Sequence, residues 1–298
     1  MKNPYTVHMA RHPKTFNAIQ SLRERYYKAL PGKESLIKVL AEAEVSEHVY
    51  NSNAIENSTL TLEETEKILL QIDLDRFVSQ RELFEAKNLA RVTEYVESKA
   101  KEAELSLPLI LFLHKMLIAN IRDDIAGRFR LTDEWVRVGT HIGADPKDIE
   151  RLLSDMLTAY YSGKERHIVE RIARLHLGFE HVHPFVDGNG RIGRVLNNYV
   201  LIREGYVPIN IAFTNRARYY DAFREFDERK TTKIMEEIVG RALSNSYHKR
   251  LAYLEGKRIV TLADYAKEHQ LSHSNVINKA NRQTIPAFLE KGVWKIVA

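Results

Sequence analysis

Two long stretches of the chain, residues 14–50 and 61–103, carry apolar side chains at helical spacing among many Glu, Lys and Arg residues. The positions that define this spacing are Leu36, Val39, Leu40 and Ala43 in the first stretch and Ile68, Leu69, Leu70 and Ile72 in the second. Residues that recur every three or four positions line one face of a helix. The pattern therefore predicts long amphipathic helices and a mainly α fold, with Thr61 and Glu64 forming a capping box at the start of the second stretch.

The segment from residue 128 to residue 146 has the composition of a β-hairpin rather than a helix. Residues that favour strands or turns lie close together in it: Trp135, Val136, Val138, Gly139, Ile142, Gly143 and the closing Pro146. Helical spacing returns after this segment. We therefore expect a short hairpin inserted into a helical body.

The composition changes again near residue 250, where a basic run precedes a segment with its own pattern. Thr261 is placed to cap a helix over 261–269, and a second helix is expected from Ser272. The following PAFLEKGVWKIV (286–297) has the pattern of two short strands. Helix, tight turn, helix and hairpin are the outline of a winged helix-turn-helix, so we predict a small winged-helix-like domain over 250–298.

The composition is that of an ordinary globular protein, with 298 residues of which 44% are hydrophobic and 29% charged. The chain has no cysteine, which excludes disulfides and cysteine-ligated zinc and suits a reducing compartment. Residues 1–16 lack the apolar run of a signal peptide, and the most apolar stretch (107–118) is too short to span a bilayer. We therefore predict a cytoplasmic protein without a membrane partner, whose net charge of +5 suits an anionic ligand.

Residues 183–194 read HPFVDGNGRIGR, a mixture that neither core packing nor a solvated loop requires. Gly188 and Gly190 flank Asn189, so the backbone is free to adopt positive φ and to expose successive N–H groups in a concave nest. Apolar residues at helical spacing follow the nest, which places it at the N-terminus of a predicted helix. Free amides and the helix dipole both favour phosphate at such a position.

Charged side chains around the nest supply the groups that phosphate chemistry needs. Arg191 and Arg194 are three residues apart, so they share a helix face and reach adjoining phosphates. Asp187 is an oxygen ligand suited to one Mg²⁺ that bridges phosphate groups. His183 titrates near neutrality and is suited to accept a proton from an attacking hydroxyl. Each residue alone is weak evidence, but together they predict catalysis on a phosphate ester.

The twelve residues match, at every specified position, the motif H-P-F-x-D-G-N-G-R-x-x-R, and the chain therefore resembles the Fic family (filamentation induced by cAMP). AGRFR (126–130) and VRVGTHI (136–142) are similar to the family's stretch leading into a β-hairpin flap, and SNAIEN (52–57) is similar to its inhibitory motif. The resemblance covers roughly residues 20–240. It implies an N-terminal helical region over 1–110 with the inhibitory motif, a Fic catalytic core over 111–249, and then the winged-helix-like domain.

The resemblance implies an enzyme that transfers AMP from ATP to a Ser, Thr or Tyr hydroxyl of a target protein. His183 is then the general base, Asp187 holds Mg²⁺, and Phe185 anchors the loop. The anion hole consists of the backbone amides of Gly188 to Gly190 together with Asn189. Arg191 binds the β-phosphate and Arg194 the γ-phosphate. The predicted nucleotide-binding set is completed by Ile192 and Gly193, by Val138, Gly139, Thr140 and His141 in the flap, and by Tyr219 and Tyr220 beside the adenine.

Two other positions follow from the same resemblance. Glu56, with Ser52 four residues before it, is predicted to form a charge-assisted pair with Arg194 and so to hold the enzyme inactive. Whether the same carboxylate also orients water for removal of AMP stays open. Asp227 stands where the family often has Asn, which leaves the identity of the bound base open as well.

Other functions also stay open on the sequence alone. A Doc-like kinase is disfavoured, because Doc-type motifs carry lysine at the position of Gly190 and lack the second arginine, Arg194. Phosphocholine transfer is not decided by the motif. A DNA-binding regulator is a third reading, since the second helix of the C-terminal domain offers His273, Asn275, Asn278, Lys279, Asn281 and Arg282 to phosphates and base edges. The same module equally suits protein contacts, so DNA and a homodimer partner both stay open.

Overall fold

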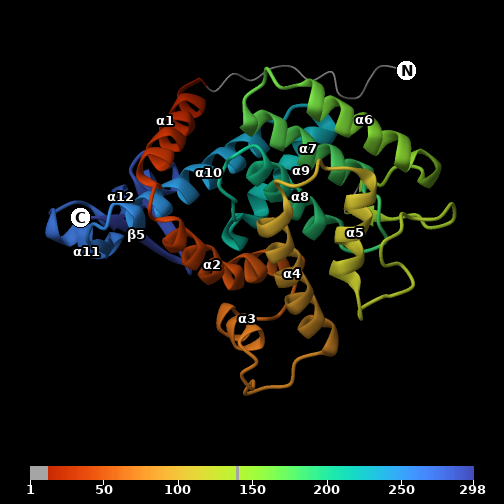
Figure 1. Cartoon of the computed structure of the whole chain (residues 1–298), viewed down its shortest axis with the longest axis horizontal. Helices are drawn as coiled ribbons and strands as arrows, with labels where there is room; N and C mark the ends of the chain where they lie inside the picture. The colour runs from red at the N-terminus through yellow and green to blue at the C-terminus, as the bar shows by residue number, and fades with distance from the viewer. Residues whose placement is uncertain (1–12, 139–140) are drawn as a thin grey trace. The chain divides into compact units, whose positions relative to one another are not determined.

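The computed structural model describes residues 13–138 and 141–298 of the chain. The protein is mainly α-helical, as the sequence predicts, with a two-stranded sheet among the helices and a three-stranded sheet near the C-terminus (Figure 1). Within the described ranges, none of the helices is both long and apolar enough to cross a lipid bilayer. The described chain divides into two compact units, one made of residues 45–206 and 211–236 and the other of residues 13–44, 207–210 and 237–298.

The first unit is a helical body with a short hairpin. Its elements are α3 (Leu62–Leu69), α4 (Gln80–Lys99), α5 (Leu107–Ile118), β1 (Arg137–Val138), β2 (His141–Ile142), the 3-10 turn η1 (Pro146–Asp148), α6 (Ile149–Ser162), α7 (Ile168–Val182), α8 (Asn189–Arg203), the 3-10 turn η2 (Phe213–Asn215) and α9 (Arg216–Arg229). Helix α8 packs against α4, α5 and α7, and α7 also packs against α6 and α9. Most side chains of α7 and α8 are buried, so these two helices form the core of the unit.

The first predicted helical stretch, 14–50, is two helices in the structure. Helix α1 runs over Pro13–Ala29 and α2 over Glu34–Ile55. The dipeptide Pro31-Gly32 separates them, because proline removes a backbone donor and Gly32 adopts a φ of 77° that a helix does not allow. Leu40 is buried as predicted, whereas Val39 is 59% exposed. The buried face is therefore narrower than the periodicity suggests.

The second stretch, 61–103, also contains a break that the sequence analysis did not predict. The capping box is confirmed, since Thr61 Oγ1 accepts the Glu64 N–H at 3.1 Å and a Glu64 carboxylate oxygen accepts the Thr61 N–H at 2.8 Å. Helix α3 nevertheless ends at Leu69, and α4 begins at Gln80. Leu70 and Ile72 lie in the connecting segment and are exposed, so their assignment to a buried helix face is wrong.

The predicted hairpin is present and short. Strands β1 and β2 pair in antiparallel fashion, with Val138 opposite His141. Gly139 and Thr140, which the sequence analysis placed in the nucleotide-binding flap, lie outside the described residues. Trp135 lies outside the strands and is 56% exposed, so it does not take the predicted strand conformation. Helical structure returns after Pro146, as expected.

The second unit contains α1 and a C-terminal group of small elements. These are β3 (Ile259–Thr261), α11 (Leu262–Glu268), α12 (His273–Asn281), β4 (Ala287–Glu290) and β5 (Val293–Val297), with the strands in the order β3-β5-β4. Thr261 caps α11 as predicted, whereas strand β3 was not predicted. Lys291 and Gly292 both adopt positive φ between β4 and β5, as a tight two-residue hairpin turn requires.

Two helices belong partly to each unit. Helix α2 continues past residue 44, and α10 (Lys233–Leu254) continues past residue 236. The sequence suggested a domain boundary at about residue 250. Helix α10 instead continues without interruption through this position and includes part of the basic run. The three-part division of the chain and the winged-helix assignment remain predictions.

Candidate active site

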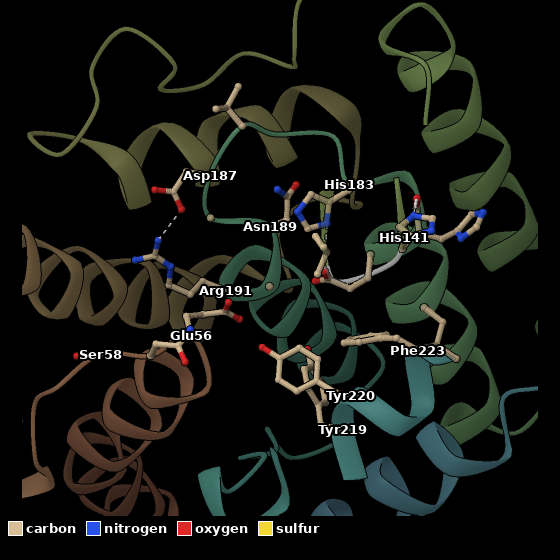
Figure 2. A pocket seen from close by; sticks show the side chains of 18 of the residues that line it. Glu56, Ser58, His141, His183, Asp187, Asn189, Arg191, Tyr219, Tyr220 and Phe223 are labelled. Atoms are coloured by element: carbon tan, nitrogen blue, oxygen red, sulfur yellow. Dashed lines mark hydrogen bonds and ion pairs between the residues drawn. The ribbon is translucent and has the colours of Figure 1, made fainter. Parts of the chain in front are cut away.

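The motif at residues 183–194 connects the end of α7 to the start of α8 (Figure 2). Helix α7 ends because His183 adopts a left-handed conformation, with φ 50° and ψ 62°, and is followed by a proline. Helix α8 begins after Gly188, whose φ is 85°. Space is also tight there, since a Cβ at Gly188 would lie 3.0 Å from Ile118 Cδ1. The turn therefore needs glycine at this position, as the sequence predicts.

The loop is held from inside by two side chains. The Asn189 side chain accepts the Phe185 N–H and donates to the Phe185 carbonyl, both at 2.8 Å. The His114 ring stacks on Phe185 with centroids 3.7 Å apart. Because His114 Nδ1 accepts the Gly127 N–H, Nε2 carries the proton and donates to the Asp187 carbonyl at 3.0 Å. Asn189 thus fixes the loop with its side chain, and only its backbone amide is left for the predicted anion hole.

His114 is a structural contributor that the sequence analysis did not identify. Burial lowers its pKa to about 4, so its ring is neutral at physiological pH. A neutral ring has one donor and one acceptor nitrogen, which is what its two backbone partners require. The signal in the sequence was a histidine in the middle of the most apolar helix, α5. Such a residue is buried only when both of its nitrogens are satisfied.

Arg130 is a second residue that the sequence analysis quoted without giving it a role. Its guanidinium is buried and donates to four backbone carbonyls, those of His183 at 2.8 Å, Glu134 at 2.8 Å, Ala144 at 2.7 Å and Val182 at 3.4 Å. Arg130 thereby links the start of the 183–194 motif to the segment before the hairpin and to the segment after it. Its role depends on contacts between distant parts of the chain, which spacing alone does not reveal.

The predicted general base, His183, is mostly buried beside a second ionisable group. Burial lowers the pKa of His183 to about 4, so the expectation that this histidine titrates near neutrality is wrong and the imidazole is neutral, with a nitrogen able to accept a proton. Glu180 Oε2 lies 3.7 Å from His183 Nδ1. Burial, followed by the nearby Glu56 carboxylate, raises the pKa of Glu180 to about 8. At neutral pH the site therefore contains a neutral histidine and a largely protonated glutamic acid.

A cavity of about 810 Å³ lies over the motif, which is within the size range of small-molecule sites. The structure brings most of the predicted site residues together around it: Glu56, Val138, His141, His183, Asp187, Gly188, Asn189, Gly190, Arg191, Tyr219 and Tyr220 (Figure 2). Ile192 is fully buried in the core, and Arg194 is also buried. The side chain of Ile192 therefore does not line the cavity, and its predicted nucleotide contact remains a prediction.

Asp187 lies between two arginines at one side of the cavity. Its carboxylate pairs with Arg191 at 3.1 Å and with Arg81, which the sequence analysis did not identify. Glu85 contacts both arginines. Burial alone raises the pKa of Asp187, but Arg191 and Arg81 outweigh it and hold that pKa below its usual value. The carboxylate is therefore ionised and lines the cavity, and an ionised carboxylate is the kind of oxygen ligand that Mg²⁺ prefers.

All three nitrogen atoms of the Arg194 guanidinium have hydrogen-bond partners within the protein. Its Nε donates to Ser52 Oγ at 2.9 Å, and one Nη donates both to the Ser52 carbonyl at 2.8 Å and to Glu56 Oε1 at 2.9 Å. The other Nη donates to the Tyr219 hydroxyl at 3.2 Å. The contact between Arg194 and Glu56 is the predicted one, whereas the two hydrogen bonds from Arg194 to Ser52 were not predicted.

Glu56 also occupies space directly at the start of α8. A Cβ added to Gly190 would collide with the Glu56 carboxylate, so the carboxylate lies against the backbone of the predicted anion hole. The N–H groups in the first turn of a helix have no partner inside the helix and attract anions. Glu56 is thus placed both on the arginine and on the nest that are predicted to bind phosphates.

The two tyrosines predicted beside the adenine have different environments. Tyr219 is 1% exposed, and its hydroxyl contacts Arg194 and, at 2.7 Å, His176 Nε2. Tyr220 is partly exposed and lies with Phe223 at the cavity (Figure 2). Tyr219 therefore helps to position Arg194, while Tyr220 and Phe223 present aromatic surface to a ligand.

Comparisons with known proteins agree with this architecture. Residues 104–201 match the sequence model of the Fic/DOC family. The chain is similar to Protein adenylyltransferase Fic of Drosophila willistoni, with 30% identity over 229 residues covering 71% of this chain and 45% of the relative. The same protein of Drosophila melanogaster matches with the same identity and coverage. The chain therefore spans about half the length of the curated relatives it matches.

Solved structures give the same result for the fold. Fic-1 from C. elegans matches with a TM-score of 0.71 and 25% identity, over 82% of this chain and 72% of that chain. A Fic domain containing signaling protein from Bacteroides thetaiotaomicron matches in fold with a TM-score of 0.72 and 24% identity, over 80% of this chain and 97% of that chain. The resemblance seen in the motif is thereby confirmed. We conclude that residues 104–201 form a domain of the Fic/DOC family.

Proposed function

We propose that this protein is an adenylyltransferase that transfers AMP from ATP to a Ser, Thr or Tyr hydroxyl of a target protein, and that Glu56 holds it in an inactive state. One observation carries the proposal: His183, Asp187 and the start of α8 line the same cavity. The names of the curated relatives support the same activity.

The bond changes follow from the groups around the cavity. The target hydroxyl oxygen attacks the α-phosphorus of ATP, and its proton passes to the neutral imidazole of His183. The bond from the α-phosphorus to the bridging oxygen breaks, and pyrophosphate leaves. The amides at the start of α8 stabilise the charge that develops on the α-phosphate oxygens.

The charged side chains orient the remaining phosphates. Asp187 holds Mg²⁺, which when bound neutralises charge on the phosphate oxygens. Arg191 binds the β-phosphate, and Arg194 binds the γ-phosphate once Glu56 has left it. Tyr220 and Phe223 provide aromatic surface to the base, which stacks well on such rings.

The test is transfer of label from ATP to protein. Wild type, Glu56→Gly and the double variant Glu56→Gly with His183→Ala are incubated with cell lysate and ATP labelled at the α- or the γ-phosphate. We expect the α-label, and not the γ-label, to appear on protein with Glu56→Gly, and the double variant to transfer none while still binding ATP. Mass spectrometry of the labelled proteins should show added AMP. Added phosphate or phosphocholine would contradict the proposal, and so would an absence of label with both wild type and Glu56→Gly.

A second function, DNA binding through the C-terminal elements, is favoured by the surface of α12. The residues predicted for DNA contacts are all exposed along or just after this helix: His273, Asn275, Asn278, Lys279, Asn281 and Arg282. We propose that they bind DNA by phosphate and base-edge contacts. The full chain should then shift a labelled duplex in a salt-dependent manner, and Lys279→Ala with Arg282→Ala should reduce the salt dependence. Equal binding by the wild type and this variant would contradict it.

A further inference from the structure

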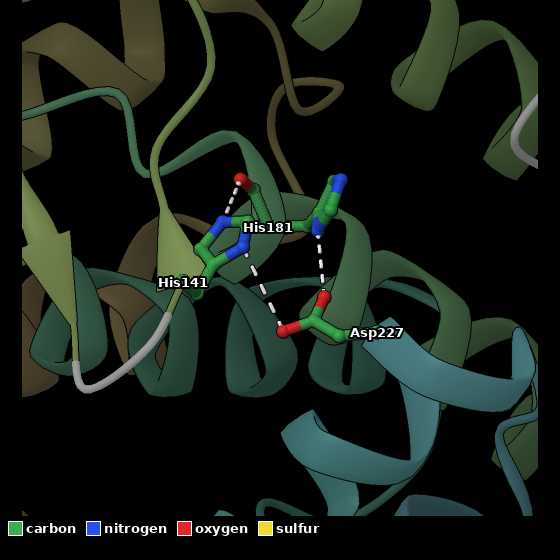
Figure 3. A group of neighbouring side chains, drawn as sticks. All are labelled: His141, His181 and Asp227. Carbon is green, nitrogen blue, oxygen red and sulfur yellow. Dashed lines mark hydrogen bonds and ion pairs between the residues drawn. The ribbon is translucent and has the colours of Figure 1, made fainter.

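Three potential metal ligands meet beside the cavity, outside the 183–194 motif (Figure 3). They are His141 on strand β2, His181 on helix α7 and Asp227 on helix α9. One ligand atom from each residue lies within 4.8 Å of those of the other two. His181 Nδ1 is 2.9 Å from one oxygen of Asp227, and His141 Nδ1 is 3.6 Å from the other. The carboxylate thus lies between two imidazole nitrogens that come from two other elements.

The hydrogen bond of His141 decides which of its nitrogens is available. His141 Nε2 lies 2.8 Å from the backbone carbonyl of His181, which only accepts, so Nε2 carries the proton. In the neutral ring, Nδ1 then has a lone pair that faces the Asp227 carboxylate at a distance too long for a hydrogen bond. A lone pair that faces an anion is unfavourable, and either a proton on Nδ1 or a metal ion between the two atoms removes the repulsion. Metal-bound histidines commonly donate their other ring nitrogen to a carbonyl in this way.

The second histidine contacts the same carboxylate. His181 Nδ1 donates a proton to Asp227 at 2.9 Å, so a metal ion that binds at this nitrogen displaces that proton. All three side chains are only partly buried, with 20%, 36% and 34% of the side chains of His141, His181 and Asp227 exposed. An ion therefore has access to the group.

The ligand types and distances indicate which metal fits. Imidazole nitrogens suit Zn²⁺, Cu²⁺, Ni²⁺ or Fe²⁺, whereas Mg²⁺ and Ca²⁺ prefer oxygen ligands. A tetrahedral zinc site has ligand bonds of about 2.0–2.2 Å, which places neighbouring ligand atoms about 3.3 Å apart. The 2.9 Å and 3.6 Å separations run to the two different oxygens of Asp227 and bracket that value, while the ligand atoms of all three residues lie within 4.8 Å of one another. The three side chains therefore move closer together when they bind one ion.

We propose that His141, His181 and Asp227 bind one divalent transition-metal ion, with Zn²⁺ as the probe of choice, at a site separate from Asp187. The ion ties the hairpin strand β2 to α7 and α9 at the cavity. Because β2 has only two residues and pairs only with β1 among the described strands, a metal link adds a further restraint to its position. The site depends only on these three side chains and stands whether or not the protein transfers AMP.

Zinc binding by the full chain tests the site directly. Isothermal titration with Zn²⁺ should give one site per chain in the wild type. His141→Ala, His181→Ala and Asp227→Asn should each weaken it by more than about 100-fold, because even an outer-shell partner of a metal is worth about 10- to 100-fold. Asp227→Asn is the most conservative variant, since it keeps the size of the side chain and removes its charge. His273→Ala, at an exposed histidine on α12, and Asp75→Asn, at an exposed acid outside the cavity, are controls that should bind as the wild type does.

Two further measurements keep the proposal testable if a histidine variant folds poorly. X-ray absorption at the zinc edge of the wild type should show two imidazole ligands, and a count of none or of more than two would overturn the assignment. Hydrogen exchange of the peptide containing β1 and β2 should slow when Zn²⁺ is added to the wild type and not when it is added to Asp227→Asn. The proposal is wrong if the wild-type protein binds no Zn²⁺, or if wild type and Asp227→Asn bind Zn²⁺ with equal affinity. Either result would show that the three side chains form only a hydrogen-bonded cluster.

Discussion

A carboxylate oxygen of Glu56 lies 2.9 Å from a guanidinium nitrogen of Arg194, although the two residues are 138 positions apart in the chain. The same carboxylate occupies the space over Gly190 at the start of α8. The arginine and the helix start are the two places where the γ-phosphate and the reacting phosphate are proposed to bind. On this proposal, one side chain competes with the nucleotide at both places.

Removal of this carboxylate should activate the enzyme. Glu56→Gly should raise AMP transfer, including self-modification, by on the order of 100-fold, because misplacement of a reacting group by about 1 Å costs that much in rate. Glu56→Gln keeps the volume and should give a smaller gain. The measurement is the initial rate of transfer of α-labelled AMP to protein.

Two further variants control for this effect. Glu63→Gly removes an exposed glutamate of α3 and should leave the rate unchanged. The double variant Glu56→Gly with Arg194→Ala should not show the gain. Removal of the Glu56 carboxylate frees Arg194 to bind the nucleotide, and this variant has no arginine to free. If Glu56→Gly transfers no more AMP than the wild type to any protein, the inhibitory role of Glu56 is wrong.

Transfer should also depend on a divalent ion held by Asp187. Asp187→Asn keeps the shape of the side chain and removes the charge, so the rate at saturating ATP should fall by at least about 100-fold, the scale of charge stabilisation by a metal. Asp75→Asn, at an exposed acid, is the matched control. Rates with added Mg²⁺ and with excess chelator provide the measurement, best made in the Glu56→Gly background. Undiminished transfer in chelator would remove the metal from the mechanism.

The buried carboxyl group of Glu180 should make stability depend on pH. Its pKa is raised from 4.5 to about 8, chiefly by burial, so the folded protein keeps a proton that the unfolded chain loses above pH 4.5. The free energy of unfolding should therefore fall as pH rises from about 4.5 to about 8, by up to about 1.4 kcal/mol per pH unit from this group. Glu180→Gln should remove this contribution.

The measurement is urea unfolding of wild type and Glu180→Gln at several pH values in that range. His183 and His114, whose pKa values are lowered to about 4, contribute with the opposite sign between about pH 4 and their ordinary value of 6.5. They are present in both proteins, so the difference between the two curves isolates Glu180. Parallel curves would mean that the Glu180 carboxyl is ionised in the folded protein.

Arg130 should act on catalysis by positioning His183. Arg130→Met leaves several buried carbonyl groups without their donor, and one such loss costs about 1–3 kcal/mol, so the variant should be less stable. Below its unfolding temperature, kcat for AMP transfer should fall while KM for ATP changes little, because the guanidinium contacts the loop and not the cavity. A rise in KM at unchanged kcat would assign Arg130 to nucleotide binding instead.

Local features of the fold were predictable because they depend on near neighbours in the chain. The capping box at Thr61, the turn at Gly188 and the helix that follows it are decided by a few adjacent residues and their backbone preferences. The breaks at Pro31-Gly32 and at 70–79 were missed because apolar periodicity was followed across turn residues. Leu70 shows the limit of such patterns, since an apolar residue at helical spacing is 70% exposed.

For the candidate site, the sequence by itself determined which chemical groups are present in the motif and, through its resemblance to a family, the partner expected for Arg194. Only the tertiary structure decided that the Asn189 side chain holds the loop rather than facing the cavity. It also decided that Arg130 and His114 support this loop and that Arg81 pairs with Asp187. It also brought His141, His181 and Asp227 together across three elements. The physical reason is that such contacts depend on how α4, α5, α7, α8 and α9 pack, and packing is decided by the shapes of distant side chains that no local pattern records.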